Sequence, residues 1–314
     1  MIKTHRYLSL SLAVLLAALF TRWVQAEDHR GFSFIVVADT AYQVPQDYDV
    51  YDKLIETMNV EAPAFTIHLG DVFSGATDCG EKHISRVVRD FKKYAHPVVY
   101  TPGDNEWTDC HRPEAGGYEP TERLENIRKL FFAKPAVLGK GSLQFKRQGN
   151  LGGFMAENIQ WQHDDVLFAT AHIVGSNNGL SDVVEYSARN KANLRWIEEV
   201  FKQATKVKSE AIVLAYHANM FAKPETPDGF GELRALIGRL GEQFGKPVLL
   251  VHGDHHQFEI DRPYLPKLQK GPGANIVRLQ TYGWPDAKAV KINVDTSRSG
   301  VFSFQPVYVG NGLY

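Results

Sequence analysis

The stretch FSFIVVAD, at residues 32–39, sets the fold class because its pattern returns twice further along the chain. AFTIHLGD at residues 64–71 and PVVYTPGD at residues 97–104 are also apolar runs that end in an aspartate. Each run is typical of a buried strand, and apolar residues show helical spacing between the runs, at 48–60 and 83–94. The 32 and 33 residues that separate successive aspartates fit one strand, helix and strand of a parallel sheet. We therefore expect an α/β fold.

The alternation of helices and strands continues to residue 251 and then changes. We expect helices at 121–132, 185–205 and 231–244, and strands at 159–163, 166–173, 211–216 and 247–251. Residues 133–154 are rich in Gly and Lys and should form a long surface excursion. Four strand-like runs with no helix between them follow, at 257–260, 276–282, 290–294 and 301–309. This last pattern predicts a second, largely antiparallel sheet.

The composition is that of an ordinary globular protein. The chain has 314 residues, of which 44% are hydrophobic and 23% are charged. These values exclude a disordered chain, a collagen and a coiled coil. The length suits one large α/β domain or two tightly joined ones.

Residues 1–26, MIKTHRYLSLSLAVLLAALFTRWVQA, have the features of a secretory signal peptide. Lys3 and Arg6 precede an apolar run at 7–20, and Ala26 supplies a small residue for cleavage. This run is shorter than the roughly 20 residues that cross a bilayer, although an uncleaved membrane anchor stays open as the alternative. We expect cleavage after Ala26 and a single domain at 27–314. The protein would then be periplasmic or secreted and free of the membrane, and the sequence does not choose between those two locations.

Removal of the signal peptide changes the charge balance. Residues 1–26 contain Lys3, Arg6 and Arg22 but no acid, so 32 basic and 36 acidic side chains remain, a net charge of −4. An acidic chain without a basic, aromatic-lined groove attracts a phosphate backbone poorly. A nuclease is therefore disfavoured, and we expect a small-molecule partner and no nucleic acid.

The residues that follow the predicted strands are of the types that bind metal ions. They are Asp39, Asp71, Asp104, His217, and the pair Asp254 and His256. A two-metal hydrolase needs carboxylates and imidazoles that converge from distant loops on one point. In an extended stretch, Asp254 and His256 would share one side with His252 while His255 faces the other. A single Gly-Asp pair is more often only a turn, but the ordered set favours a metal site.

Both cysteines, Cys79 and Cys110, lie in the exported part of the chain. An even count in such a chain predicts one disulfide. Each cysteine follows a Gly-Asp pair by a few residues, so the bond would clamp together two loops that carry candidate ligands. Two unrelated thiols are the alternative.

Taken in order, these residues resemble the calcineurin-like metallophosphoesterase superfamily. The matching motifs are Asp39, Gly70-Asp71, Gly103-Asp104-Asn105-Glu106, His217 and Gly253-Asp254-His255-His256. The resemblance implies a four-layer α/β/β/α sandwich, in which two mixed sheets are flanked by helices. It also implies that Asp39 and His256 bind a first metal, that Asp71 bridges, and that Asp104, His217 and Asp254 bind a second metal. The stretches SGATDC, TPGDNEWTDC and HIVGSNNG look like a poorly characterised group of exported bacterial members.

The chain departs from the family pattern at four positions. Ala41 stands where the family has a histidine ligand, so the first metal loses a ligand unless Tyr42 or water replaces it. Asp104 replaces an asparagine and Asp254 replaces a histidine. These changes make the site harder and more anionic, which favours two divalent ions such as Mn²⁺, Mg²⁺ or Fe²⁺, with Ca²⁺ or Zn²⁺ as further options. Asn105 stands where the family has its catalytic histidine, and an amide can hold a phosphoryl oxygen but cannot donate a proton as a general acid.

Other polar residues could support the reaction. His68 and His172 are candidates for the missing general acid, although such histidines are more often hydrogen-bonded core residues. His252 is a candidate for orienting a metal ligand, and Glu106 for orienting Asn105 or bracing its loop. Trp107 could line the pocket or act as a packing anchor.

The sequence as a whole predicts an exported phosphoesterase that hydrolyses a small-molecule phosphate ester. Two metal ions would activate the hydroxide that attacks phosphorus. The losses at Ala41 and Asn105 motivate an alternative, a non-catalytic or weakly active relative that binds metal or phosphate. The substrate, the preference for monoesters or diesters and the oligomeric state stay open.

Overall fold

The computed structural model describes residues 31–265 and 273–309. The described residues from Phe32 onward form one compact unit. The signal peptide predicted at residues 1–26 lies outside the described residues. Among the residues that the structure describes, no helix combines the length and the apolar character that a membrane span requires.

The first sheet has six strands in the order β13-β12-β1-β2-β3-β4. Their bounds are β1 (Phe32–Val37), β2 (Thr66–His68), β3 (Pro97–Tyr100), β4 (Leu138–Gly139), β12 (Lys288–Val294) and β13 (Phe302–Tyr308). Strands β1, β2 and β3 run parallel, as the strand and helix spacing predicts. Strands β4, β12 and β13 pair antiparallel with their neighbours, so the sheet is mixed.

The second sheet has seven strands in the order β10-β11-β9-β8-β7-β6-β5. Their bounds are β5 (Lys146–Arg147), β6 (Ile159–His163), β7 (Val166–Thr170), β8 (Ala211–Ala215), β9 (Val248–His252), β10 (Glu259–Asp261) and β11 (Ile276–Gln280). Strands β7, β8, β9 and β11 are parallel, and the other three are antiparallel to their neighbours. This sheet is therefore mixed as well.

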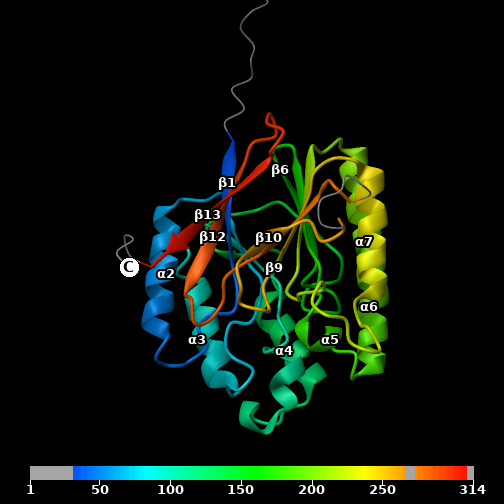
Figure 1. Cartoon of the computed structure of the whole chain (residues 1–314). Coiled ribbons are helices and arrows are strands. Elements are labelled where there is room, and N and C mark those ends of the chain that lie inside the picture. The colour runs from blue at the N-terminus through cyan, green and yellow to red at the C-terminus, as the bar shows by residue number, and fades with distance from the viewer. Residues whose placement is uncertain (1–30, 266–272, 310–314) are drawn as a thin grey trace, which may run out of the picture. The chain divides into compact units, whose positions relative to one another are not determined.

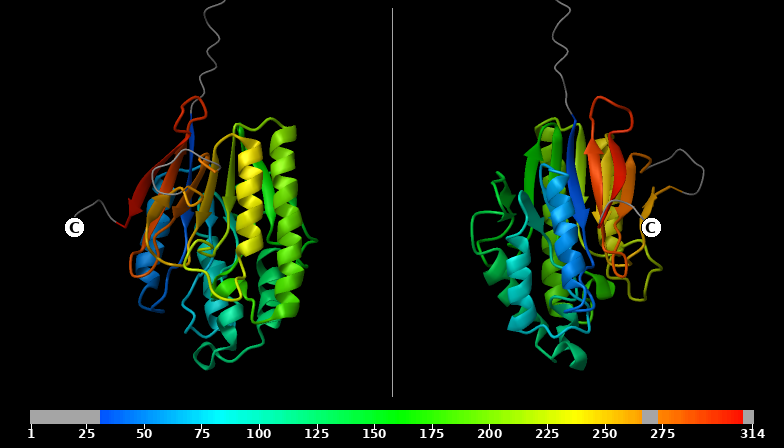
Figure 2. Two further views of the ribbon diagram at one scale, coloured as in Figure 1. Left: turned by 45° about the vertical axis from the view of Figure 1, so that its right-hand side comes forward. Right: turned by 90° about the vertical axis from the view of Figure 1, so that its left-hand side faces the viewer.

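Helices cover the outer faces of the two sheets (Figure 1 and Figure 2). Helices α2 (Tyr48–Val60), α3 (Glu81–Phe91) and the end of α4 (Pro120–Phe131) pack on the first sheet, and α6 (Val183–Lys206) and α7 (Gly231–Phe244) pack on the second. In α2 the buried residues are Tyr51, Leu54, Ile55 and Met58, which follow the spacing of one helical face. Short helical turns complete the fold: α5 (Gly175–Asn178), η1 (Thr108–His111) and η2 (Pro113–Ala115).

The two sheets pack face to face around a shared apolar core. Phe34 and Val36 of β1 point into this core, and Ile35 and Val37 point to the helices on the other side. Because both faces of β1 are covered, its sequence is apolar without alternation. The predicted four-layer α/β/β/α sandwich with two mixed sheets is confirmed.

The prediction for the C-terminal strands is wrong. These strands form no separate antiparallel sheet: β10 and β11 extend the second sheet, and β12 and β13 extend the first. The sequence shows that no helices separate these strands, but it does not show which edge each one joins. The expected excursion at residues 133–154 also contains two short strands. Strand β4 lies at one edge of the first sheet, and β5 lies at one edge of the second.

Candidate metal centre

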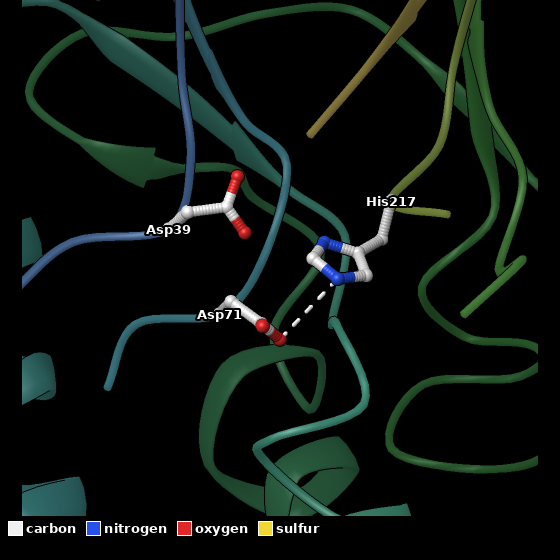
Figure 3. Close-up of side chains that lie close together, drawn as sticks. All are labelled: Asp39, Asp71 and His217. Carbon is white, nitrogen blue, oxygen red and sulfur yellow. Dashed lines mark ion pairs between the residues drawn. The ribbon is translucent and has the colours of Figure 1, made fainter. Parts of the chain in front are cut away.

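The carboxyl ends of strands from both sheets bring the predicted ligands together. Asp39, Asp71 and Asp104 follow β1, β2 and β3, and His217 and Asp254 follow β8 and β9. Figure 3 shows the side chains of Asp39, Asp71 and His217 pointing toward one another. Functional groups of α/β sheets gather at this end of the strands because the loops there are free to vary.

His217 lies at the centre of the cluster. Its Nδ1 donates a hydrogen bond of 2.7 Å to the Leu69 carbonyl, which leaves Nε2 facing the carboxylates. Nε2 is 3.1 Å from Asp104 Oδ1 and 3.4 Å from Asp71 Oδ1. His217 falls within two groups that could each hold a metal ion, one with Asp39 and Asp71 and the other with Asp104 and Asp254.

Two buried polar atoms in this cluster make no hydrogen bond of acceptable geometry, although they lie 3.1 Å apart. They are His217 Nε2 and Asp104 Oδ1. Buried polar atoms are nearly always paired, so an unpaired donor or acceptor needs an explanation. A metal ion between the side chains would accept both lone pairs, and the residues present therefore fit the metal that the resemblance implies.

His256 also lies beside the cluster. Its Nδ1 donates to the Trp284 carbonyl at 2.8 Å, and its Nε2 lies 3.8 Å from Asp39 Oδ1. Asp254 and His256 do face the site, although the alternation argument used to predict it fails. Both residues have a positive φ, of 79° and 60°, so this stretch is not extended.

Burial and mutual interaction shift the pKa values of the clustered carboxylates and of His217. Burial raises the pKa of Asp39 to about 8 and raises the pKa of Asp71 well above its ordinary value. Burial also raises the pKa of Asp254. Burial alone would lower the pKa of His217, but the nearby carboxylates raise it well above its usual range. Asp104, beside His217, is the one cluster carboxylate whose pKa falls, because the imidazole outweighs burial. Without metal ions, bound protons therefore offset the negative charge of the cluster, which metal cations would otherwise neutralise.

The backbone at the cluster is strained. Asp39, Asp71, Asp254 and His256 all have φ between 52° and 79°. Left-handed conformations cost non-glycine residues roughly 1 kcal/mol or more each and gather at functional sites. Such strain at four of the six predicted ligands supports a functional arrangement rather than ordinary turns.

Glycines let the backbone approach the carboxylates closely. A Cβ on Gly103 would lie 2.0 Å from Asp71 Oδ1, and a Cβ on Gly253 would lie 2.4 Å from Asp39 Oδ2. Contacts below 3 Å do not occur between real atoms of these kinds, so a side chain at either position would displace the carboxylate.

Glu106 braces the two loops that carry Asp71 and Asp104. Its Oε2 accepts from the backbone N–H groups of Asp71 (3.1 Å) and Gly103 (3.0 Å). Its Oε1 accepts from the Val72 N–H (3.2 Å) and the Tyr100 hydroxyl (3.0 Å). Of the two roles considered for Glu106, the structure places it in the second, as a brace.

Asn105 lies beside the cluster but has no free amide hydrogen. Its Nδ2 donates to Tyr42 Oη at 3.0 Å and to the Phe73 carbonyl at 2.9 Å. Its backbone N–H donates to Asp71 Oδ1 at 3.1 Å. In this arrangement Asn105 positions Tyr42 and Asp71 rather than presenting its amide to a phosphoryl group.

The predicted disulfide between Cys79 and Cys110 is confirmed, with a Cα–Cα distance of 5.8 Å. Both sulfur atoms lie 3.6 Å from the Asn105 carbonyl oxygen. The bond therefore packs directly against the loop that carries Asn105.

The other candidate histidines make no side-chain hydrogen bond to a predicted ligand among the described residues. His68 has no exposed surface and packs among the rings of Tyr51, Phe91 and Tyr100, and burial lowers its pKa to about 3. Its ring packs among aromatic side chains and makes no hydrogen bond to a predicted ligand, so its proposed role as general acid has no geometric support.

His172 and His252 are also fully buried. His172 donates from Nδ1 to Glu157 at 2.6 Å, within a buried network, and lies beside the Trp107 ring. Trp107 is buried and acts as a packing anchor. His252 stacks on Tyr216 and donates to the Gly253 carbonyl. Neither histidine makes a hydrogen bond to a predicted ligand, so the general-acid role for His172 and the orienting role for His252 have no geometric support.

Sequence reasoning missed Ser176. Its hydroxyl donates to Asp104 Oδ2 at 2.9 Å and to Asp109 Oδ1 at 3.1 Å. Residues 176–178 all have a positive φ, and a Cβ on Gly175 would lie 2.7 Å from both Asp104 oxygens. The SNN sequence signals a turn, but nothing in it shows that the turn covers Asp104.

No family model matches the sequence, and no curated protein was found to match it. Comparison with solved structures does find similar proteins: 42 chains match the structure of this chain. A dimetal phosphatase from Danio rerio aligns with a TM-score of 0.51 over 89% of this chain and 99% of its own, at 9% identity. The chain has the metallophosphoesterase fold.

Two further structures share the metallophosphoesterase fold with this chain. The purple acid phosphatase PPD1 from yellow lupin has a TM-score of 0.51 and 12% identity, over 88% of this chain and 54% of its own. GAP50, described as the anchor in the inner membrane complex of Plasmodium, has a TM-score of 0.51 and 9% identity, over 90% of both chains. At such low identities the likeness shows the fold alone, so function must be argued from this chain's own residues.

Proposed function

We propose that this protein is an exported, metal-dependent phosphoesterase that acts on a small-molecule phosphate ester. The observation that carries the proposal is the convergence of ligand-type side chains from five strand ends around His217, where Nε2 and Asp104 Oδ1 make no hydrogen bond of acceptable geometry. The metallophosphoesterase fold supports the same reaction class.

The described residues would hold two metal ions. Asp39 and Asp71 would hold the first together with His256, whose Nε2 lies 3.8 Å from Asp39 Oδ1. Asp104, His217 and Asp254 would hold the second, with Asp71 shared between the two. Bound divalent ions would supply Lewis-acid activation of water and neutralise the phosphoryl oxygens. The excess of carboxylates favours hard ions such as Mn²⁺, Mg²⁺ or Fe²⁺.

The chain's own groups have three tasks around the metals. The carbonyls of Leu69 and Trp284 accept from Nδ1 of His217 and His256. They thereby keep the proton on Nδ1 and leave the lone pair of Nε2 free to face the site. Glu106 fixes the spacing of the loops that carry Asp71 and Asp104. Ser176 limits the rotation of Asp104 by donating to its Oδ2.

Export is supported by two observations. The sequence begins with the features of a signal peptide, and the two cysteines in the described part of the chain form a disulfide. Disulfides persist in oxidising compartments such as the periplasm and the extracellular space. A periplasmic or secreted location is therefore part of the proposal.

The proposal is tested with purified protein that has been stripped with a chelator and supplied with Mn²⁺, Mg²⁺ or Fe²⁺. Hydrolysis of p-nitrophenyl phosphate and bis(p-nitrophenyl) phosphate should depend on added metal. His217→Ala should remove this activity, and Asp49→Asn, a change at an exposed aspartate, should keep it. Turnover that continues in the chelator, or in His217→Ala, would show that the proposed site is not the catalyst.

A second candidate is a protein of the same fold that binds metal or phosphate without turnover. Both amide hydrogens of Asn105 are engaged, and the burial of His68 and His172 gives neither histidine a geometry that supports the role of general acid. GAP50, which shares the fold, is described as an anchor. Stoichiometric metal binding with no hydrolysis of either aryl ester would favour this candidate.

A further inference from the structure

A cavity of about 370 Å³ lies within residues 133–154, the segment that carries β4 and β5 at the edges of the two sheets. Its walls include the apolar side chains of Leu143, Phe145 and Leu151. Leu143 and Phe145 also pack against the core between the sheets, whereas Leu151 is half-exposed. At roughly 30 Å³ per water, the cavity has the volume of about twelve waters. This size suits a small organic molecule and is larger than an inorganic ion would fill.

Arg147 brings a positive charge to the wall of this cavity. Its Nε and Nη1 are enclosed and make no hydrogen bond, although buried polar atoms are nearly always paired. The side chain as a whole is only partly buried, so Nη2 is the guanidinium nitrogen that remains accessible. Arg147 is the one ionisable residue among those that line the cavity, so no lining carboxylate repels an anion there.

Glu157, on the inner side of Arg147, does not neutralise this charge. Both oxygens of Glu157 already accept hydrogen bonds from Arg128, at 2.6 and 3.1 Å. A cavity of about 20 Å³ that Arg147 and Glu157 both line has room for one water, which carries no charge. Burial lowers the pKa of Arg147, but a guanidinium stays protonated in proteins. An anion in the larger cavity would supply the missing counter-charge.

The guanidinium is held in position before any ligand arrives. It lies over the ring of Phe145, 5.1 Å from the ring centroid, and over the ring of Phe132 at 5.8 Å. The backbone of Arg147 pairs with Ile159 between β5 and β6. A charge that is fixed in this way loses little freedom when an anion binds to it.

We propose that this cavity binds a small organic anion, whose charged head pairs with Arg147 Nη2 and whose apolar body lies against Leu143, Phe145 and Leu151. Both halves of this ligand answer to a feature of the cavity. An inorganic ion would leave the apolar walls uncovered, and a neutral apolar molecule would leave the charge unpaired. The cavity shares no residue with the proposed metal centre, so this binding site does not depend on the proposed phosphoesterase activity.

The test is isothermal titration calorimetry of the purified protein with octanoate, which joins one carboxylate to an apolar chain. A chelator is present throughout, so that no metal ion binds the carboxylate. Wild-type protein should bind octanoate with a Kd below about 1 mM. Octan-1-ol, which lacks the charge, and acetate, which lacks the apolar chain, should each bind at least roughly 10-fold more weakly.

Three variants locate the binding. Arg147→Met keeps an apolar stem but removes the charge and should weaken octanoate binding by roughly 10- to 100-fold. Leu151→Asp places a like charge at a half-exposed position of the wall and should weaken binding as well. Arg239→Met, at an exposed arginine of α7, is the matched control and should bind as wild type does. Circular dichroism checks that each variant is folded.

The proposal is overturned if wild-type protein does not bind octanoate, or binds octan-1-ol equally well. It is also overturned if folded Arg147→Met binds octanoate as tightly as wild type. If Arg147→Met does not fold, Leu151→Asp and the comparison of octanoate with octan-1-ol decide. Weaker binding by Leu151→Asp and by the alcohol supports the site, and unchanged binding by either refutes it.

Discussion

Glu106 offers a graded test of how the site is built, because its four hydrogen bonds can be removed in two steps. In Glu106→Ala the N–H groups of Asp71, Val72 and Gly103 all lose their acceptor in a buried space. Each orphaned donor costs about 1 to 3 kcal/mol, and water that enters the vacated space recovers a part. We expect the free energy of unfolding to fall by about 3 to 6 kcal/mol.

Glu106→Gln should cost less because the amide keeps the shape and one acceptor oxygen. If that oxygen faces the Asp71 and Gly103 N–H groups, the amide nitrogen faces Tyr100, whose hydroxyl can reverse and accept, and the Val72 N–H. One donor is then orphaned instead of three. The expected loss is about 1 to 3 kcal/mol.

The assay is urea unfolding of chelator-treated protein with the disulfide intact, comparing midpoints at equal slope. Glu125→Ala, at an exposed helix position, is the control and should stay within about 0.5 kcal/mol of wild type. The reasoning is refuted if Glu106→Ala is as stable as wild type, or if the glutamine variant loses as much as the alanine variant.

Three further predictions concern other parts of the molecule. Replacing Cys79 and Cys110 by serine opens a loop with a sequence separation of 31 and should lower the free energy of unfolding by about 3.7 kcal/mol. Urea unfolding measures this loss, and an unchanged midpoint would contradict the prediction. Burial lowers the pKa of His96 to about 4, below its unfolded value, so the protein loses stability through His96 as the pH falls from about 6.5 to 4. The free energy of unfolding, measured by urea titration at pH 7 and pH 5, should therefore fall less in His96→Gln than in wild type. Equal losses in the two proteins would contradict this. Gly175→Ala would place a Cβ 2.7 Å from the Asp104 oxygens and should weaken Mn²⁺ binding roughly 10- to 100-fold by calorimetry, whereas an unchanged affinity would show that Asp104 is not a ligand.

The central part of the fold could be predicted because it depends on local pattern. Helices α2 and α7 and strand β6 have the bounds that apolar spacing indicates, and the spacing of Asp39, Asp71 and Asp104 correctly implies parallel strands. The C-terminal strands could not be assigned to a sheet, because pairing at a sheet edge depends on neighbours distant in sequence. Val290 of β12, for example, pairs with Val36 of β1.

The site was predictable in its residue types and not in its hydrogen bonds. The end of a strand fixes where Asp71 or His217 lies, so order and spacing suffice to list such residues. The bonds that give each group its role cross between loops, as from Glu106 to Asp71 and from Ser176 to Asp104. His68 illustrates the reverse error, since its place in a strand beside the site did not show that its ring faces the helices.

The central claim is that the strand-end carboxylates hold metal ions that hydrolyse a phosphate ester, and Asp71, proposed to be shared by both ions, tests it most directly. The measurement is the initial rate of p-nitrophenyl phosphate hydrolysis as Mn²⁺ is added to metal-free wild-type protein and to Asp71→Asn. We predict that the wild-type rate rises with Mn²⁺ and saturates, and that Asp71→Asn, although folded, stays lower by roughly 10²- to 10⁴-fold at every concentration. Equal rates for the two proteins, or a wild-type rate that does not respond to Mn²⁺, would contradict the claim.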